Sequence, residues 1–232
     1  MKFSEICNEG IYQKTKMNPF RVVLEEIKKD CSDAWESFVS NGAVIYRGTS
    51  QTSDYIKANP QNGKRKSAYT LNYYTVAMSQ LPSFKDYPPR DRSLICSTSV
   101  IKTREYGNTF VVFPLNGTKI GIVNKKDIWY STPYGNDTYL YEITEYMIDY
   151  FSYHCCNTVS AQLNYEKKQK LGTTYKGFVE TITPDRCGFT LETTSDFYKN
   201  HNRKFESEIW FSNTAWMISE KWLKWWISDI GI

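Results

Sequence analysis

The sequence predicts an α+β domain in which helices flank several short, mainly antiparallel strands. Three observations predict this class. Apolar residues recur every three or four positions over residues 20–38, which is helical spacing. From residue 93 onward, short apolar runs bounded by Gly, Pro and Asn indicate strands. A second stretch with helical spacing, at residues 139–163, separates these runs into two groups, so strands and helices do not alternate regularly.

The first expected helix has clear start and stop signals. The Asn-Pro pair at 18–19 supplies an N-cap and then a proline at the first helical position, where its missing N–H costs nothing. The Asn-Gly pair at 41–42 ends the helix. Residues 43–46 then predict a short buried strand that leads to the Arg-Gly pair at 47–48.

The remaining elements are expected as follows. Residues 50–70 are polar and rich in turn residues, and a helix is expected over 70–81. The Asn-Gly pair at 116–117 predicts a turn that joins the strands at 109–114 and 119–123. The other expected elements are a proline-marked loop at 82–89, strands at 93–99, 174–182, 187–193, 207–211 and 216–218, and a tryptophan-rich C-terminal segment.

Length and composition indicate one globular domain over residues 1–232. A chain of 232 residues and 27.2 kDa can bury a core without a disulfide or metal staple. The hydrophobic fraction of 41% and the charged fraction of 23% exclude a disordered or fibrous protein. The aromatic fraction of 16% supplies core volume and flat surfaces that can stack on a ligand. A net charge of +4 permits an anionic ligand or nucleic acid without demanding one.

Residue usage excludes several classes of protein and site. No apolar run approaches the length of about 18 residues that a membrane span needs, and the N-terminal residues lack the apolar region of a signal peptide. The 6 cysteines form no CxxC pair, which favours reduced thiols and a cytoplasmic location. With only 2 histidines, most zinc sites and most Ser-His-Asp mechanisms are excluded, and we expect no metal.

Three short motifs stand out, each beside an expected strand: Tyr-Arg-Gly at 46–48, Ser-Thr-Ser at 97–99 and Glu-Ser-Glu at 206–208. Side chains alternate along a strand, so Glu206 and Glu208 would point to the same face. Two carboxylates on one face repel each other, an arrangement with little use in a purely structural strand. Taken singly, each motif is also compatible with an ordinary solvated strand end, because motifs this short recur by chance.

In this order the motifs resemble the arginine–serine–glutamate class of ADP-ribosyltransferases, a family that includes bacterial toxins, arginine-specific ectoenzymes and many phage-encoded enzymes. Residues 104–114 are similar to the loop and strand that follow the family's Ser-Thr-Ser motif. Residues 206–216 are similar to its Glu-x-Glu strand, turn and next aromatic residue. Residues 65–114 are especially similar to phage-associated members. The resemblance covers residues 43–123 and 187–218.

The resemblance implies an ADP-ribosyltransferase-like split β-sandwich, in which two packed, mainly antiparallel sheets form the core and helices flank them. Within the single domain, residues 1–42 would form an N-terminal helical part. The separation between Ser97 and Glu206 is larger than in the compact toxins, so residues from about 124 to 186 would form a helical insertion. Asn213 stands where many members carry glycine.

The resemblance also implies NAD as the substrate and assigns roles to residues. Glu208 would be the catalytic carboxylate that stabilises the cationic transition state, and Glu206 would orient or deprotonate the acceptor. Arg47 would bind the phosphate and ribose of NAD through its planar guanidinium, and Ser97 would hydrogen-bond the catalytic carboxylate. The other expected NAD-contacting residues are Thr98, Ser99, Arg104 and Tyr106, and the expected acceptor-binding residues are Phe197 and Tyr198. Considered alone, an arginine at a strand end is more often a surface ion-pair partner, and aromatic residues such as Phe197 and Tyr198 are more often ordinary surface or core residues.

Three functions stay open at this point. A glutamate at position 206 accompanies arginine acceptors in the family, which implies transfer to protein arginine. An RNA or DNA base is the alternative acceptor; basic clusters at 64–66, 167–170 and 199–204 would serve it, although such clusters are also ordinary solvated faces. The third is a non-enzymatic interaction protein that uses the tryptophans at 222–226. An active transferase would endanger its own cell, so we expect a toxin restrained by a cognate inhibitor, or a phage protein that acts on a host.

Overall fold

The structure is a computed structural model, which describes residues 12–13, 20–42, 44–63, 78, 81–124, 128, 183–201 and 206–230. The elements expected at 139–163 and 174–182, and nearly all of the expected insertion, lie outside these residues. The N-cap pair at 18–19 and most of the helix expected over 70–81 also lie outside them.

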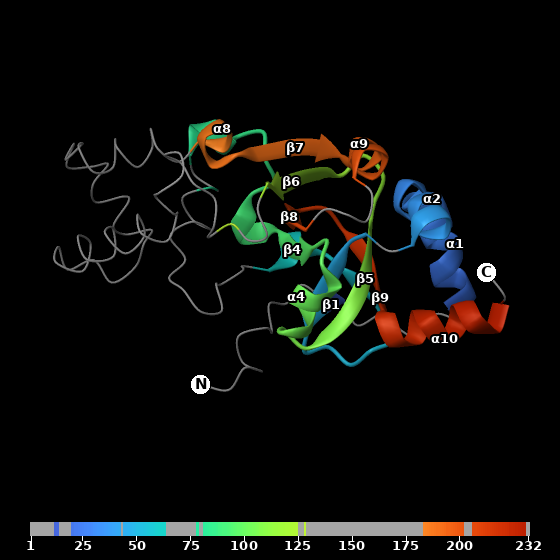
Figure 1. The fold of residues 1–232 in the computed structure, drawn as a ribbon. Helices are drawn as coiled ribbons and strands as arrows, with labels where there is room; N and C mark the ends of the chain where they lie inside the picture. Colours follow the sequence, from blue (N-terminus) through green and yellow to red (C-terminus); the bar gives the residue numbers. More distant parts are fainter. Residues whose placement is uncertain are drawn as a thin grey trace, which may run out of the picture.

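Within the described residues, nine strands form a single sheet in which neighbouring strands are antiparallel (Figure 1). The strands are β1 (Tyr12–Gln13), β2 (Tyr46–Thr49), β3 (Tyr55–Ala58), β4 (Leu94–Ser97), β5 (Asn108–Pro114), β6 (Lys119–Val123), β7 (Phe189–Thr193), β8 (Glu208–Phe211) and β9 (Ala215–Ser219). Their order in the sheet is β1-β3-β9-β5-β2-β4-β8-β6-β7. The structure confirms the strands expected at 93–99, 109–114, 119–123, 187–193, 207–211 and 216–218.

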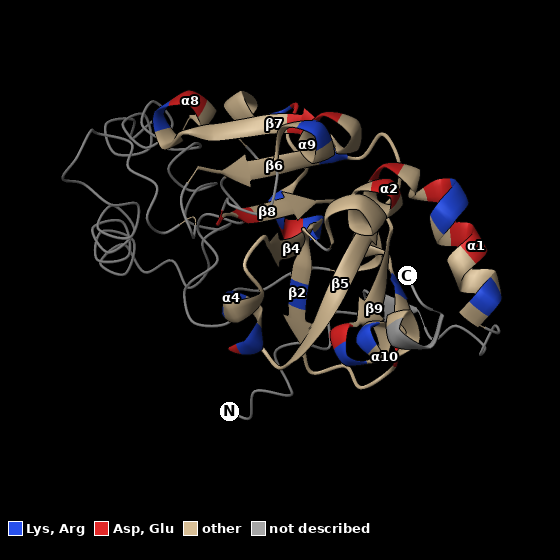
Figure 2. Ribbon diagram, turned by 45° about the vertical axis from the view of Figure 1, so that its right-hand side comes forward, with Lys and Arg blue, Asp and Glu red and all other residues tan. Residues whose placement is uncertain are grey.

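A single residue pair, Tyr46 with Ser97, joins β2 to β4 and so connects two parts of the sheet. The first part is β1-β3-β9-β5-β2, and the second is β4-β8-β6-β7. Strands β6, β7 and β8 run across the direction of β5 and β9, so the sheet is strongly bent (Figures 1 and 2). The expected α+β class with antiparallel strands is confirmed. The structure has one bent sheet rather than two separate sheets, because the β2–β4 pair makes the ladder continuous.

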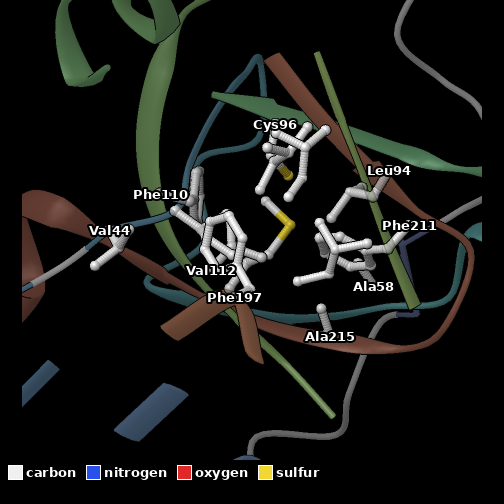
Figure 3. Close-up of a cluster of buried hydrophobic side chains, with 14 of the residues drawn as sticks. Val44, Ala58, Leu94, Cys96, Phe110, Val112, Phe197, Phe211 and Ala215 are labelled. Atoms are coloured by element: carbon white, nitrogen blue, oxygen red, sulfur yellow. The ribbon is translucent and has the colours of Figure 1, made fainter. Parts of the chain in front are cut away.

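Both parts of the sheet contribute to the main core (Figure 3). Phe110 and Met217 come from the first part, and Cys96 and Phe211 come from the second. Phe197, from the helix α9 (Thr194–Asn200), belongs to the same cluster. Burial of an apolar side chain of this size stabilises the fold by roughly 1.5–3 kcal/mol, so this shared core holds the bent sheet in shape.

Three helices cover the opposite face of β5 and β9 (Figure 1): α1 (Phe20–Asp30), α2 (Ser32–Asn41) and α10 (Glu220–Ile230). A second apolar cluster joins Phe113 and Trp216 of these strands to Ile27 of α1 and Leu223 of α10. Both faces of β5 and β9 are therefore buried. That burial explains why their sequences are continuous apolar runs rather than alternating ones.

The C-terminal helix α10 packs on the domain's own core. The ring centroids of Trp222 and Trp226 lie 4.0 and 5.0 Å from that of Phe20 in α1. The Trp225 side chain lies on the outside of the helix and is 63% exposed. In the described part of the chain, no helix combines the length and apolar character that crossing a membrane requires.

The expected N-terminal helix is two helices, because the backbone leaves helical geometry at Cys31. The break brings Asp30 and Cys31 against β5 and the connection that follows it. The Asp30 carbonyl accepts a hydrogen bond from Asn116 N at 2.8 Å, and the Cys31 thiol donates to the Phe113 carbonyl at 3.3 Å. Helical spacing in the sequence does not reveal such a break, because the apolar periodicity continues through it.

The turn expected at 116–117 is confirmed, but the two strands that it joins do not pair with each other. Strand β5 pairs with β2 and β9, whereas β6 pairs with β7 and β8. The Asn116 side chain binds the start of α2, where Oδ1 accepts from Asp33 N at 3.1 Å and Nδ2 donates to Ser32 Oγ at 2.9 Å. The turn therefore carries the chain from one part of the sheet to the other.

Other elements depart from the sequence expectation. Strand β3 lies in the segment expected as polar turns, where it pairs with β9 and buries Ile56 and Ala58. Strand β2 begins at Tyr46, where the expected strand was to end. The short helices are α4 (Val100–Arg104), α8 (Pro184–Cys187), and the 3-10 turns η2 (Pro60–Asn62), η3 (Pro82–Phe84) and η4 (Arg90–Arg92).

We expect the substitution Asn116→Ala to lower the free energy of unfolding by about 1–2 kcal/mol, because it removes the acceptor for the orphan Asp33 N–H of α2. Asn116→Asp keeps that acceptor and should lose less. Urea unfolding of the three proteins, followed by far-ultraviolet circular dichroism, measures the difference. Equal stability of Asn116→Ala and the natural protein would show that these bonds do not hold the turn.

Candidate functional site

Strands β2, β4 and β8 are neighbours in the sheet, and each carries or adjoins one of the three sequence motifs. Ser97 pairs with Tyr46 on one side and with Glu208 on the other, so the motifs form one row across the strands. In Figure 2, β2 lies beside β4 and carries one blue band, which marks a basic residue. The strand has no other charged residue. The structure thus brings the arginine, serine and glutamate motifs together.

Hydrogen bonds extend the pairing of β4 with β8 by one more residue on each strand. Thr98 N donates to the Ser207 carbonyl at 3.0 Å, and Ser207 N donates to the Thr98 hydroxyl at 2.8 Å. Ser97 Oγ accepts from Ser99 N at 3.0 Å. Glu208 is the residue directly opposite Ser97, so the two side chains lie on the same face of the sheet. The second and third motifs are therefore joined, although Thr98 and Ser207 are 109 residues apart in the chain.

Arg47 lies one residue beyond the joining pair, so alternation places its side chain on the other face of β2 from Tyr46. Its Nη1 atom donates to the carbonyl of Ile95 in β4 at 2.7 Å. Since β2 and β4 share only one residue pair, the guanidinium makes a contact between these strands where their ladder has already opened. Ser97 and Glu208 share the face of Tyr46, so Arg47 contacts the backbone of β4 from the opposite face of the sheet.

The Gly48 residue lets α4 pack directly on β2. A Cβ atom at this position would lie 1.8 Å from the Thr103 carbonyl oxygen and 2.9 Å from the Tyr106 Cβ. A Cβ atom essentially never lies within 3.0 Å of such atoms, so no larger residue fits without moving α4. The Arg-Gly pair thus combines a residue that binds β4 with one that admits the helix following the Ser-Thr-Ser motif.

Glu208 forms an ion pair that sequence analysis did not predict. Its Oε1 atom accepts a hydrogen bond from Arg90 Nη2, and only 4% of the Arg90 side chain and 13% of the Glu208 side chain are exposed. The Arg90 guanidinium also lies over the Trp210 ring, 5.4 Å from its centroid. Glu208 and Trp210 lie on the same face of β8, away from the main core. A single arginine in a proline-rich loop offers no sequence signal for this contact.

The loop that carries Arg90 is fixed to the same face of β8. Trp210 Nε1 donates to the Pro88 carbonyl at 3.0 Å, and the Tyr87 ring stacks on the indole with centroids 6.0 Å apart. The Ser93 hydroxyl donates to the Pro89 carbonyl at 2.7 Å. Arg90 is therefore presented to Glu208 by a segment that packing and hydrogen bonds hold on both sides.

The remaining expected contact residues lie near β8 and α4 in the chain and differ in exposure. Glu206 is exposed and precedes β8 by two residues. Ser99 is buried at the start of α4. Arg104 and Tyr106 are exposed at the end of α4, on the side of β2 that Gly48 opens.

The expected acceptor-binding residues Phe197 and Tyr198 occupy a different environment from the one expected. They lie in helix α9 rather than in an open turn. Phe197 is fully buried in the main core, and Tyr198 packs against both apolar clusters. Burial also raises the pKa of the Tyr198 hydroxyl well above its ordinary value. A fully buried side chain cannot meet a macromolecular acceptor, so Phe197 is a core residue, whereas Tyr198 is only partly buried and its expected role stays a prediction.

The Cys96 thiol, one residue before Ser97, is buried in the main core. Burial raises its pKa to about 12; the charge of Arg47 opposes this rise and the charge of Glu208 adds to it. Both charges thus act on the same buried thiol. The thiol stays protonated at neutral pH, so Cys96 is a core residue and not a nucleophile.

The described residues contain no group of three or more His, Cys, Asp or Glu side chains arranged to hold a metal ion. What the row does offer is a largely buried carboxylate with a serine opposite it, while the Arg47 guanidinium binds the backbone of the same strand, β4. Such groups stabilise positive charge and bind hydroxyl and phosphate groups. Comparison of the chain with protein-family models, with curated proteins and with solved structures gives no match.

We expect Gly48→Ala to lower the free energy of unfolding by about 3 kcal/mol, because the new methyl group would collide with the backbone of Thr103. Gly117→Ala is the matched control. Its φ of +71° is strained for alanine, but no atom lies within 4 Å of the added Cβ, so a loss of only about 1–2 kcal/mol is expected. Urea unfolding of both variants measures the contrast, and equal losses would contradict the close packing of α4 on β2.

Proposed function

We propose that this chain is a mono-ADP-ribosyltransferase that takes NAD as substrate and transfers its ADP-ribose to a macromolecular acceptor. The observation that carries the proposal is the row Tyr46–Ser97–Glu208, which assembles the arginine, serine and glutamate motifs on three adjacent strands. The finer fold follows from the same proposal. The two parts of the bent sheet would correspond to the two sheets of a split β-sandwich, with the β2–β4 pair as their seam.

In the proposed reaction, the bond between the anomeric carbon of the ribose and the nicotinamide nitrogen breaks. Nicotinamide leaves with the bonding electron pair, and the anomeric carbon gains oxocarbenium character. The acceptor then forms a bond to this carbon and loses a proton. A carboxylate held beside the ribose lowers the barrier because it stabilises the developing positive charge, an effect worth a few kcal/mol.

Glu208 suits that task because its carboxylate is mostly removed from water, where electrostatic interactions are stronger. Its Oε1 atom binds Arg90, which leaves Oε2 to accept a hydrogen bond from a ribose hydroxyl. Arg47 would bind a phosphate oxygen, since its guanidinium presents several N–H donors. Glu206, exposed on the same chain segment, would orient or deprotonate the acceptor.

Protein arginine is the acceptor that we propose, because a glutamate occupies position 206. Nucleic acid is the other outcome of the same experiment. Incubation with isotopically labelled NAD, followed by mass spectrometry of separate protein and RNA fractions, identifies which class of acceptor carries the label.

We expect Glu208→Gln to lower the rate of label transfer at least about 100-fold, because the amide keeps the shape of the carboxylate but not its charge. Glu105→Gln is the matched control, since Glu105 is exposed just past α4 and has no assigned role. Nicotinamide release and label incorporation are measured for all three proteins. Equal transfer by Glu208→Gln and the natural chain would exclude the catalytic assignment, and intact NAD in every sample would exclude the enzyme.

A further inference from the structure

We propose that Arg90 is a positioning residue, which holds the Glu208 carboxylate in its reactive orientation through one charged hydrogen bond from its guanidinium. This inference rests on the proposed function and adds a residue outside the three motifs. It begins from the ion pair between Arg90 Nη2 and Glu208 Oε1, in which both side chains are largely buried.

The surroundings of Arg90 fix the guanidinium plane. The Trp210 ring lies beneath it, with 5.4 Å between the guanidinium carbon and the ring centroid. The indole is in turn held by its hydrogen bond to Pro88 and by stacking on Tyr87. Because Glu208 and Trp210 are two residues apart on one face of β8, the same short strand presents both the carboxylate and the platform for its partner.

The pair is poorly arranged for stability alone. In the part of the chain that the structure describes, the second guanidinium nitrogen, Arg90 Nη1, is buried and has no hydrogen-bond partner. An unsatisfied buried donor destabilises the folded state, and two apolar residues of similar volume would often fill such a space at least as well. The arrangement is reasonable if its purpose is to hold one carboxylate oxygen and leave the other for the substrate.

The test uses release of nicotinamide from NAD with water as the acceptor, so that the acceptor's identity does not matter. We expect Arg90→Gln to lower kcat about 100-fold with little change in KM, because a misplaced carboxylate loses transition-state contacts rather than substrate binding. Arg90→Lys keeps the charge but not the planar guanidinium that lies over the Trp210 ring, and should lower kcat about 10-fold. Arg92→Gln is the matched control, because Arg92 lies in the same turn with 52% of its side chain exposed; its kcat should stay within about twofold of the natural value.

A double-mutant cycle separates positioning from general damage. If Arg90 acts through Glu208, Arg90→Gln should cause no further loss of kcat in a Glu208→Gln background. If the two losses multiply instead, Arg90 does not act through Glu208 and the proposal is wrong. Arg90→Lys with the natural kcat would also overturn it. If Arg90→Gln lacks a cooperative unfolding transition, the cycle is run with Arg90→Lys.

Failure of the positioning role and failure of the proposed function give different results. If the natural chain releases nicotinamide and Arg90→Gln does so with a kcat within about twofold of the natural value, only the role of Arg90 is overturned. An absence of release from the natural chain overturns the enzyme assignment and the positioning role together.

Discussion

The pairing of β4 with β8 is the interaction on which the arrangement of this domain depends. It sets Ser97 opposite Glu208 and brings Thr98 and Ser207 together, although 109 residues separate them in the chain. Because side chains alternate along both strands, this one register decides which residues enter the core and which face the Arg90 loop. A shift by one residue would send Glu208 into the apolar cluster of Cys96 and Ile209, where an unpaired carboxylate would be very costly.

A second constraint is the near-opening of the sheet between β2 and β4. The single pair there lets the sheet bend so that both of its parts share one core. It also leaves part of the β4 backbone unpaired with β2, and there the Arg47 side chain donates a hydrogen bond to the Ile95 carbonyl. The polar residues of the row therefore gather where the ladder is interrupted. The bend and the candidate site have the same structural origin.

Local patterns in the sequence predicted much of the fold. Strands β4, β5, β6 and β7 were expected within a few residues of their bounds, because their apolar runs end at glycine, proline or polar residues. Strand β3 was missed, since its sequence, Tyr-Ile-Lys-Ala, is short and half polar; it is a strand only because β9 lies beside it. Similarly, the apolar spacing over residues 20–38 predicted a helix correctly but could not reveal the break at Cys31, which exists to meet Asn116.

The candidate site divides in the same way. The types and order of Arg47, Ser97 and Glu208 were determined by the sequence alone, because a resemblance needs only residues and their spacing. Their placement on adjacent strands, the partnership of Glu208 with Arg90, and the burial of Phe197 were decided by the tertiary structure. The physical reason is that local propensity acts over a few residues, whereas strand pairing and desolvation join segments that are distant in the chain.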